Sequence, residues 1–176
     1  MRSVCTIALC ITAILGFTAE LRAQRTERQL VIDSHSAELL PISRRVLHDS
    51  GRIFSGTVLQ VEHRDSGSSS ALATTRIVFR VDEAIRNVRR GQTVEINEWA
   101  GLWQSGERYH PGERALIFFY PPSKLGLTSP VGNRAGRFAV NRAGSVTFKA
   151  PPGRPSRTIE IRRVAAAIRQ AEKDSR

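Results

Sequence analysis

The chain has 176 residues and a formal net charge of +11 at pH 7, because 27 lysine and arginine residues outnumber 16 aspartate and glutamate residues. This length fits one domain with a hydrophobic core of its own. Its two cysteines, Cys5 and Cys10, both lie in an apolar run at the amino terminus. Without that run the chain contains no thiol, which excludes disulfide bonds and zinc sites made of cysteine.

The amino terminus has the pattern of an export signal. Arg2 supplies a positive charge, residues 4–17 form a short apolar stretch, and residues 21–23 form a cleavage site before Gln24. The stretch is shorter than the roughly 20 apolar residues of a membrane-spanning helix. We therefore expect residues 1–23 to be removed and the mature chain to be periplasmic or extracellular, with no stable membrane insertion. A retained membrane anchor is the alternative.

Removal of this signal leaves a mature chain of 153 residues that still carries a net charge of +10. Most of its positive charge is arginine, whose planar guanidinium group binds carboxylate, phosphate and sulfate. An anionic polymer, such as a nucleic acid or an acidic polysaccharide, is therefore one class of partner. The arginines occur as separated pairs, for example Arg44 with Arg45 and Arg162 with Arg163, so a general bias in composition is the alternative explanation.

Hydrophobic patterns predict the elements of the first half of the chain. The polar leader 24–40 contains one apolar patch at 30–32 that would add an edge strand. Helical spacing over 41–49 predicts a short helix that begins at Pro41. A strand follows over 52–63, where Gly56 indicates a bulge or a sharp bend. The clearest strand covers 75–85, and its buried side is predicted to hold Thr75, Ile77, Phe79, Val81 and Ile85.

The second half is predicted in the same way. A third strand covers 93–97, and the unbroken apolar run 115–120 indicates a strand that is buried on both faces. Two further strands, 137–140 and 145–148, are expected to form a hairpin through the turn 141–144. Prolines then end the sheet. The helical spacing of Ile161, Val164, Ala165 and Ile168 predicts a terminal amphipathic helix that packs on the sheet, with binding to a membrane surface or a partner as the alternative.

These elements predict an all-β fold with flanking helices. The expected architecture is a small OB-like barrel of five to six strands with a C-terminal amphipathic helix. A β-sandwich is the alternative. The expected boundaries are a signal peptide at 1–23, a polar leader at 24–40, the barrel domain at 41–150, and a proline-rich linker with the helix at 151–176.

Four segments carry a resemblance to a known family. They read DSGRIFSGTV at 49–58, FRVDEAIRN at 79–87, GERALIFF at 112–119 and GRFAV at 136–140. The chain resembles exported bacterial proteins with a netrin-like barrel, which is the barrel of the tissue inhibitors of metalloproteinases. In those inhibitors an amino-terminal cysteine chelates the zinc of the protease. Cleavage here would expose Gln24, so the resemblance implies the barrel and leaves inhibition of a protease through another edge as an open possibility.

The loop between the third and fourth strands holds most of the candidate binding residues. They are Glu98, Trp99, Trp103, Glu107, Tyr109 and His110, and Lys124 joins them from the next long loop, 121–136. Exposed aromatic rings stack on sugars, peptides or bases, and carboxylates accept hydrogen bonds from hydroxyl groups. The alternative is that the two tryptophans plug one end of the barrel. Leu125 and Leu127 would fold the long loop back over the core.

We therefore expect an exported, non-enzymatic binding domain that uses no cofactor and whose ligand or protein partner is unidentified. An anionic-polymer binder and a protease-inhibitor-like module are alternatives. A hydrolase of envelope sugars that uses Glu98 and Glu107 is a further alternative, but a glycine-containing loop does not fix the distance between two carboxylates. No pair of histidines has a spacing that would place both on one metal ion.

Overall fold

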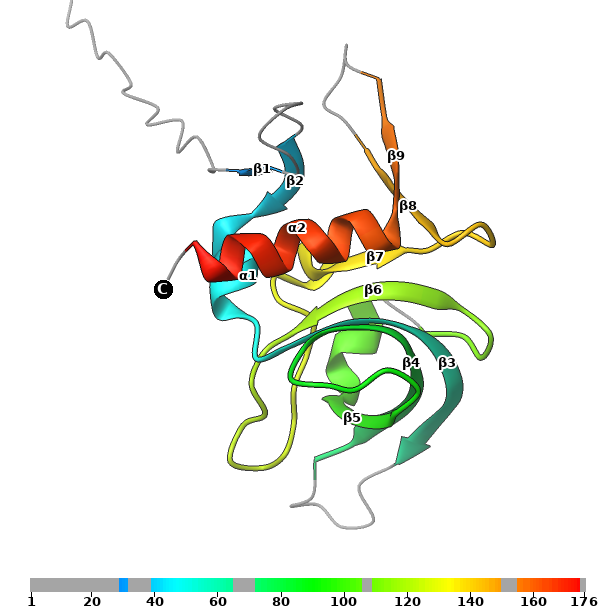
Figure 1. Ribbon diagram of the computed structural model, residues 1–176. Coiled ribbons are helices and arrows are strands. Elements are labelled where there is room, and N and C mark those ends of the chain that lie inside the picture. The colour runs from blue at the N-terminus through cyan, green and yellow to red at the C-terminus, as the bar shows by residue number, and fades with distance from the viewer. Residues whose placement is uncertain (1–28, 32–38, 65–71, 106–108, 150–154, 175–176) are drawn as a thin grey trace, which may run out of the picture.

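A computed structural model describes residues 29–31, 39–64, 72–105, 109–149 and 155–174 (Figure 1). The expected signal peptide, 1–23, lies outside the described residues. The main element is a five-stranded antiparallel sheet with the strand order β5-β4-β3-β6-β7. Its strands are β3 (Arg52–Arg64), β4 (Thr74–Arg86), β5 (Thr93–Trp99), β6 (Arg114–Phe119) and β7 (Arg137–Ala139). The all-β class with flanking helices is confirmed.

Strand β3 is the centre of this sheet and is irregular. It pairs with β4 on one side and with β6 on the other, and its register with β4 shifts between Ser55 and Gly56. A Cβ atom at Gly56 would lie 2.7 Å from the carbonyl oxygen of Arg80, so a larger residue would push the two strands apart. The bulge predicted from Gly56 is therefore present, and it lets the two strands approach closely.

The sheet is not closed into a barrel, so the predicted closure is wrong. Residues 127–130 of the long loop fill the space between β5 and β6 and make only isolated bridges, Asn97 to Leu127 and Phe119 to Pro130. Pro130 has no N–H to donate, which prevents a continuous ladder at this position. The loop turns back through backbone hydrogen bonds, such as Thr128 N to Asn97 O at 2.9 Å. Leu125 is 72% exposed and does not pack on the core.

One face of the sheet carries an inner hydrophobic cluster. Phe79 is at its centre, with ring centroids 5.5 Å from both Phe54 and Tyr109 and 6.1 Å from Phe119. The side chains of β4 that alternate inward, including Ile77 and Val81, complete it. Residues 115–119 of β6 are fully buried and contribute to both faces of the sheet, which confirms the strand predicted there.

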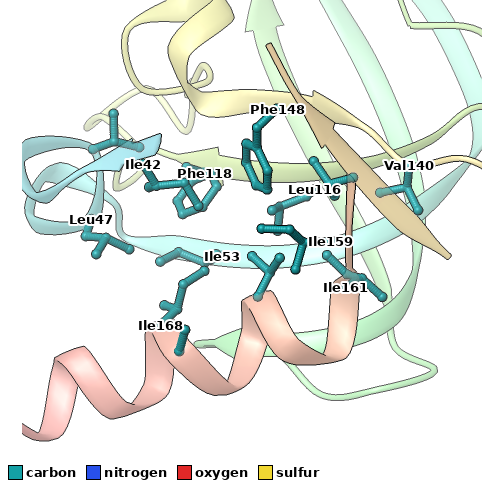
Figure 2. Packing of buried hydrophobic residues seen from close by; sticks show 14 of the residues in the cluster. Ile42, Leu47, Ile53, Leu116, Phe118, Val140, Phe148, Ile159, Ile161 and Ile168 are labelled. Carbon is teal, nitrogen blue, oxygen red and sulfur yellow. The ribbon is translucent and has the colours of Figure 1, made fainter. Parts of the chain in front are cut away.

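The other face carries a helix-side cluster under the C-terminal helix α2 (Ile161–Lys173). Figure 2 shows Ile161 and Ile168 of α2 pointing toward Ile53, Leu116 and Phe118 of the sheet. The helix α1 (Arg44–Asp49) and two small sheets surround this cluster. Those sheets consist of β1 (Gln29–Val31) with β2 (Leu39–Ser43), and β8 (Ser145–Phe148) with β9 (Arg157–Glu160). The predicted packing of the terminal helix on the sheet is therefore confirmed.

Two ion pairs hold α2 along β4. Arg86 Nε lies 2.6 Å from Glu172 Oε1, and Arg169 Nη2 lies 2.7 Å from Glu83 Oε1. Arg169 also donates to the carbonyl oxygen of Ala84. These contacts join residues 86 positions apart in sequence, so they fix the direction of the helix across the sheet. No helix within the described ranges combines the length and the apolar character that a membrane crossing requires.

The start of helix α1 differs from the prediction. Pro41 lies in strand β2, and the N-cap is Ser43, whose hydroxyl oxygen accepts a hydrogen bond from the backbone N–H of Val46 at 3.2 Å. Serine satisfies a free N–H of the first turn, which proline cannot do. The helix therefore begins later than its apolar spacing indicates.

Four strand predictions also need correction. Ile85 packs in the helix-side cluster and not in the inner cluster. Asp82 is an extra residue in β4 at the register shift between Ser55 and Gly56, so the side chains after it alternate in the opposite sense. The predicted turn at 141–144 is present and is closed by a hydrogen bond from Asn141 N to Ser145 O at 2.9 Å. The two segments that it joins make only the isolated bridge Val140 to Val146, since β7 pairs with β6 and β8 pairs with β9. Sheet structure also resumes after the prolines, in β9. The leader patch does form a strand, β1, but it pairs with β2 rather than with the edge of the main sheet.

Candidate functional site

Two of the predicted binding residues form a buried pair. Glu98 is 2% exposed and Tyr109 is 3% exposed, and the hydroxyl of Tyr109 donates a hydrogen bond to Glu98 Oε1 at 3.2 Å. Glu98 faces inward because β5 continues to Trp99, so it alternates with the buried Val94 and Ile96. A carboxylate in this position is closed off from solvent.

Arg137 extends this pair toward the surface. Its Cζ atom lies 4.1 Å from the centre of the Tyr109 ring, and its Nη2 atom donates to Glu113 Oε1 at 2.6 Å. Burial raises the pKa of Tyr109 well above its ordinary value of 10.0, and the negative charge of Glu98 raises it further, whereas Arg137 opposes the shift. We call Glu98, Tyr109, Arg137 and Glu113 the Tyr109 network. It stabilises one end of the inner cluster.

This network predicts a loss of stability in alkaline solution. The folded state holds the Tyr109 proton more tightly than the unfolded state does. The contribution of Tyr109 to the free energy of unfolding is therefore complete below pH 10 and is lost as the pH rises above that value. We expect the free energy of unfolding to fall less steeply above pH 10 in Tyr109→Phe than in the wild type. Urea unfolding from pH 9 upward measures this. Tyr120→Phe, at an exposed tyrosine, is the control and should keep the wild-type slope.

Of the other predicted binding residues, the structure describes the side chains of Trp99, His110 and Lys124, which come from three different segments. The Trp99 side chain is 51% exposed. A Cβ atom at Gly101 would overlap its indole ring, so the ring lies against the 3-10 helix that follows it, η1 (Ala100–Ser105). Leu102 of η1 packs on the inner cluster. Trp99 therefore does not plug the end of the sheet. The side chain of Trp103, and the whole of Glu107, lie outside the described parts of the chain.

His110 and Lys124 are both exposed and lie on separate turns. The backbone N–H of His110 donates to Glu113 Oε2 at 3.2 Å, which fixes the turn before β6. Lys124 lies on the turn that closes through a hydrogen bond from Gly126 N to Ser123 O. The structure thus brings Glu98 and Tyr109 together and leaves Trp99, His110 and Lys124 as separate surface groups.

A second candidate site lies on the helix side of the sheet, next to the first turn of α2. It is an open groove of about 790 Å³ between strands β3, β4 and β6, the β4–β5 loop, the turn before β8 and the start of α2. We call it the arginine groove and define it by Ser55, Thr57, Arg80, Asp82, Arg90, Arg114 and Arg162.

Strand register builds the floor of this groove. Thr57 of β3 lies opposite Arg80 of β4 and opposite Arg114 of β6, so the three side chains form a row across the sheet. The bulge in β4 adds Asp82 to the same face. Asp82 accepts a hydrogen bond from the Thr57 hydroxyl at 2.7 Å and lies 3.5 Å from the Nε atoms of both Arg80 and Arg114. Two guanidinium groups therefore offset its charge.

Three connections form the walls. The N–H of Gly91 donates to Val81 O at 2.8 Å, which places Arg90 beside the floor. Helix α2 begins against the turn that ends at Gly144, because Ile161 N donates to Gly144 O at 2.9 Å. The N-cap residue Glu160 makes no side-chain capping bond. The positive end of the helix dipole is therefore directed at the groove without a carboxylate cap.

One floor residue is unusual. Ser55 is 0% exposed and lines the groove, and its hydroxyl has no hydrogen-bond partner among the residues that the structure describes. A buried hydroxyl without a partner costs about 1 to 3 kcal/mol. Stable cores avoid this cost, so a ligand that accepts a hydrogen bond from Ser55 would recover it.

The arginines of this region are largely free for a ligand. In the part of the chain that the structure describes, no ion pair involves Arg89, Arg90, Arg142 or Arg162, and all four are exposed. Arg89 and Arg90 lie on the β4–β5 loop, and Arg142 lies on the turn that ends at Gly144. Positive charge therefore surrounds a concave surface.

This groove is hard to predict from the sequence, because its arginines come from four segments that only the folded strand order brings together. The alternation of β4 does place Arg80 on the polar side.

Among the described residues, no three side chains of histidine, cysteine, aspartate or glutamate lie close enough together to hold a metal ion. Comparison with known proteins finds no matching family, no matching curated protein and no matching solved structure, so the netrin-like relationship stays a prediction.

Proposed function

We propose that this protein is an exported, non-enzymatic binding domain whose ligand is an anionic polymer, and that the arginine groove is where the polymer binds. The observation that carries this proposal is the set of exposed arginines around a concave surface that make no ion pair within the described chain. The net charge of +11 favours association with polyanions over a wide area. Export rests on the pattern of residues 1–23.

The position of Glu98 supports a binding role over the hydrolase alternative. An acid or base in sugar hydrolysis must reach the bond that breaks. Glu98 is instead buried and accepts a hydrogen bond from Tyr109, so its carboxylate stabilises the fold.

A second candidate function uses the exposed face of Trp99. Its indole is half exposed and rests against Gly101, which holds the ring in a fixed orientation. Such a ring stacks on a sugar or a base. The two surfaces are separable by mutation, because Trp99 is not part of the arginine groove.

The polymer proposal predicts a strong dependence of binding on salt. We expect the affinity for a short DNA duplex or for heparin to fall steeply between low and high salt, because each phosphate that an arginine neutralises releases a counterion. For the duplex, replacing Arg90 and Arg162 with glutamine should lower the slope of log K against log salt by about two, one for each lost contact. Fluorescence anisotropy at several salt concentrations measures both quantities.

The control makes the same charge change elsewhere. Arg44 and Arg157 are exposed and lie outside the groove, so the double variant Arg44→Gln with Arg157→Gln should keep nearly the wild-type slope. Equal losses in the two double variants would show that only total charge matters and would contradict the groove. A loss confined to Trp99→Ala would favour the aromatic surface. Binding that is independent of salt would contradict the whole proposal.

A further inference from the structure

The arginine groove contains a partly buried centre that is more specific than a basic surface. Ser55 lies at the inner end of the floor, where the row Ile53, Ser55 and Thr57 passes from the helix-side cluster into the groove. Its hydroxyl is buried and has no partner in the described parts of the chain, so it is available to donate a hydrogen bond to a ligand atom that enters from the groove.

Further donors surround this hydroxyl. The first turn of α2 has no side-chain cap, and its N–H groups and dipole favour a negative ligand. Arg162 belongs to that turn, and Arg90 lies on the opposite wall. Arg80 and Arg114 each contact Asp82 through Nε, which leaves further guanidinium N–H groups of these forks for a ligand.

Three carboxylates in the groove oppose an anion, and their charges are largely offset. Asp82 accepts from Thr57 and lies between two arginines. Glu83 pairs with Arg169 of α2. Glu160 is the only lining carboxylate without a recorded ion pair in the described chain, and both Arg90 and Arg162 remain to outweigh it.

We propose that this centre binds one tetrahedral oxyanion, a phosphate or sulfate ester group, with Ser55 as a hydrogen-bond donor at its base. The donors come from below, from the helix start and from two walls, which suits the tetrahedral arrangement of phosphate or sulfate oxygens better than a planar carboxylate. The inference rests on the proposed function, since such a group would be one unit of the anionic polymer.

The test uses inorganic phosphate and the full chain at constant ionic strength. Titration followed by amide chemical shifts should show saturable binding, with the largest shifts at Thr57, Gly91 and Arg162. Ser55→Ala should weaken phosphate binding about tenfold, because a hydrogen bond to a charged group is lost without any change in charge. Its urea midpoint without phosphate should be equal to or above that of the wild type, because an unsatisfied buried hydroxyl is removed. Ser129→Ala, outside the groove, should bind phosphate like the wild type.

Titrations with three other small anions then identify which chemical group the centre binds. Dimethyl phosphate represents the diester of a nucleic-acid backbone, methyl sulfate represents a sulfated sugar, and acetate represents a carboxylate. Tighter binding of one of the first two identifies the source of the oxyanion and supports the proposal. Acetate binding as tight as phosphate binding would overturn the tetrahedral assignment, and a Ser55→Ala variant with wild-type phosphate affinity would overturn the role of Ser55.

The outcomes separate this inference from the proposed function. DNA or heparin binding that depends on the groove arginines, together with no saturable phosphate or sulfate binding, would overturn the oxyanion centre and leave the polymer proposal in place. Absence of binding to the polymers and to both small anions would overturn the two together.

Discussion

Replacing Phe79 with alanine lowers the free energy of unfolding by about 3 to 5 kcal/mol. This is the expected result because Phe79 is fully buried and its ring contacts three other aromatic rings of the inner cluster. Removal of the ring loses both its transfer free energy and the packing of its neighbours, and the surrounding strands cannot collapse into the space. Urea unfolding followed by circular dichroism measures the change.

Leu125→Ala is the matched control for this variant. Leu125 is also apolar but is mostly exposed at the tip of the long loop, so its removal should change the free energy of unfolding by no more than about 0.5 kcal/mol. A cost below about 1 kcal/mol for Phe79→Ala would show that the inner cluster is not the packed core that we describe.

The second large effect concerns the C-terminal helix. Val164 is fully buried in the helix-side cluster, so Val164→Asp places a carboxylate without a partner among apolar side chains. We expect a cost of at least about 4 kcal/mol, a large part of the total stability of a domain of this size. The measurement is thermal unfolding together with the rate of proteolysis at 25 °C.

Ala166 provides the control on the same helix. It is exposed, so Ala166→Asp adds the same charge without burying it and should change the stability by no more than about 0.5 kcal/mol. Equal effects of the two substitutions would contradict the packing of α2 on the sheet and would favour the alternative that the helix binds a membrane or a partner.

The regular parts of the fold follow from local patterns in the sequence. The alternation of Ile77, Phe79 and Val81 predicts which side of β4 is buried, and the apolar run of β6 predicts a strand with two buried faces. Both predictions are confirmed because a strand has a side-chain period of two and because α2 covers the second face. Ile85 fails because a bulge adds one residue and reverses the alternation, which no local pattern reveals.

The candidate binding loop shows how a small error in a boundary changes a site. Its hydrophobic pattern predicts that the third strand ends at residue 97, which places Glu98 in an exposed loop. It continues to Trp99, so alternation turns Glu98 into the interior and Trp99 outward. The arginine groove is harder still to predict, since Thr57, Arg80 and Arg114 meet only through the pairing of three strands.

The order in which the residues of the two clusters follow along the chain has a consequence for biosynthesis. Among the described residues, the hydrophobic side chains of the inner cluster all lie at or before Phe119, whereas those of the helix-side cluster include Ile159 to Ile168. A growing chain therefore keeps Ile53, Leu116 and Phe118 exposed to water until residues 159–168 have been made. We expect such a chain to stay open to chaperones until these residues have been made.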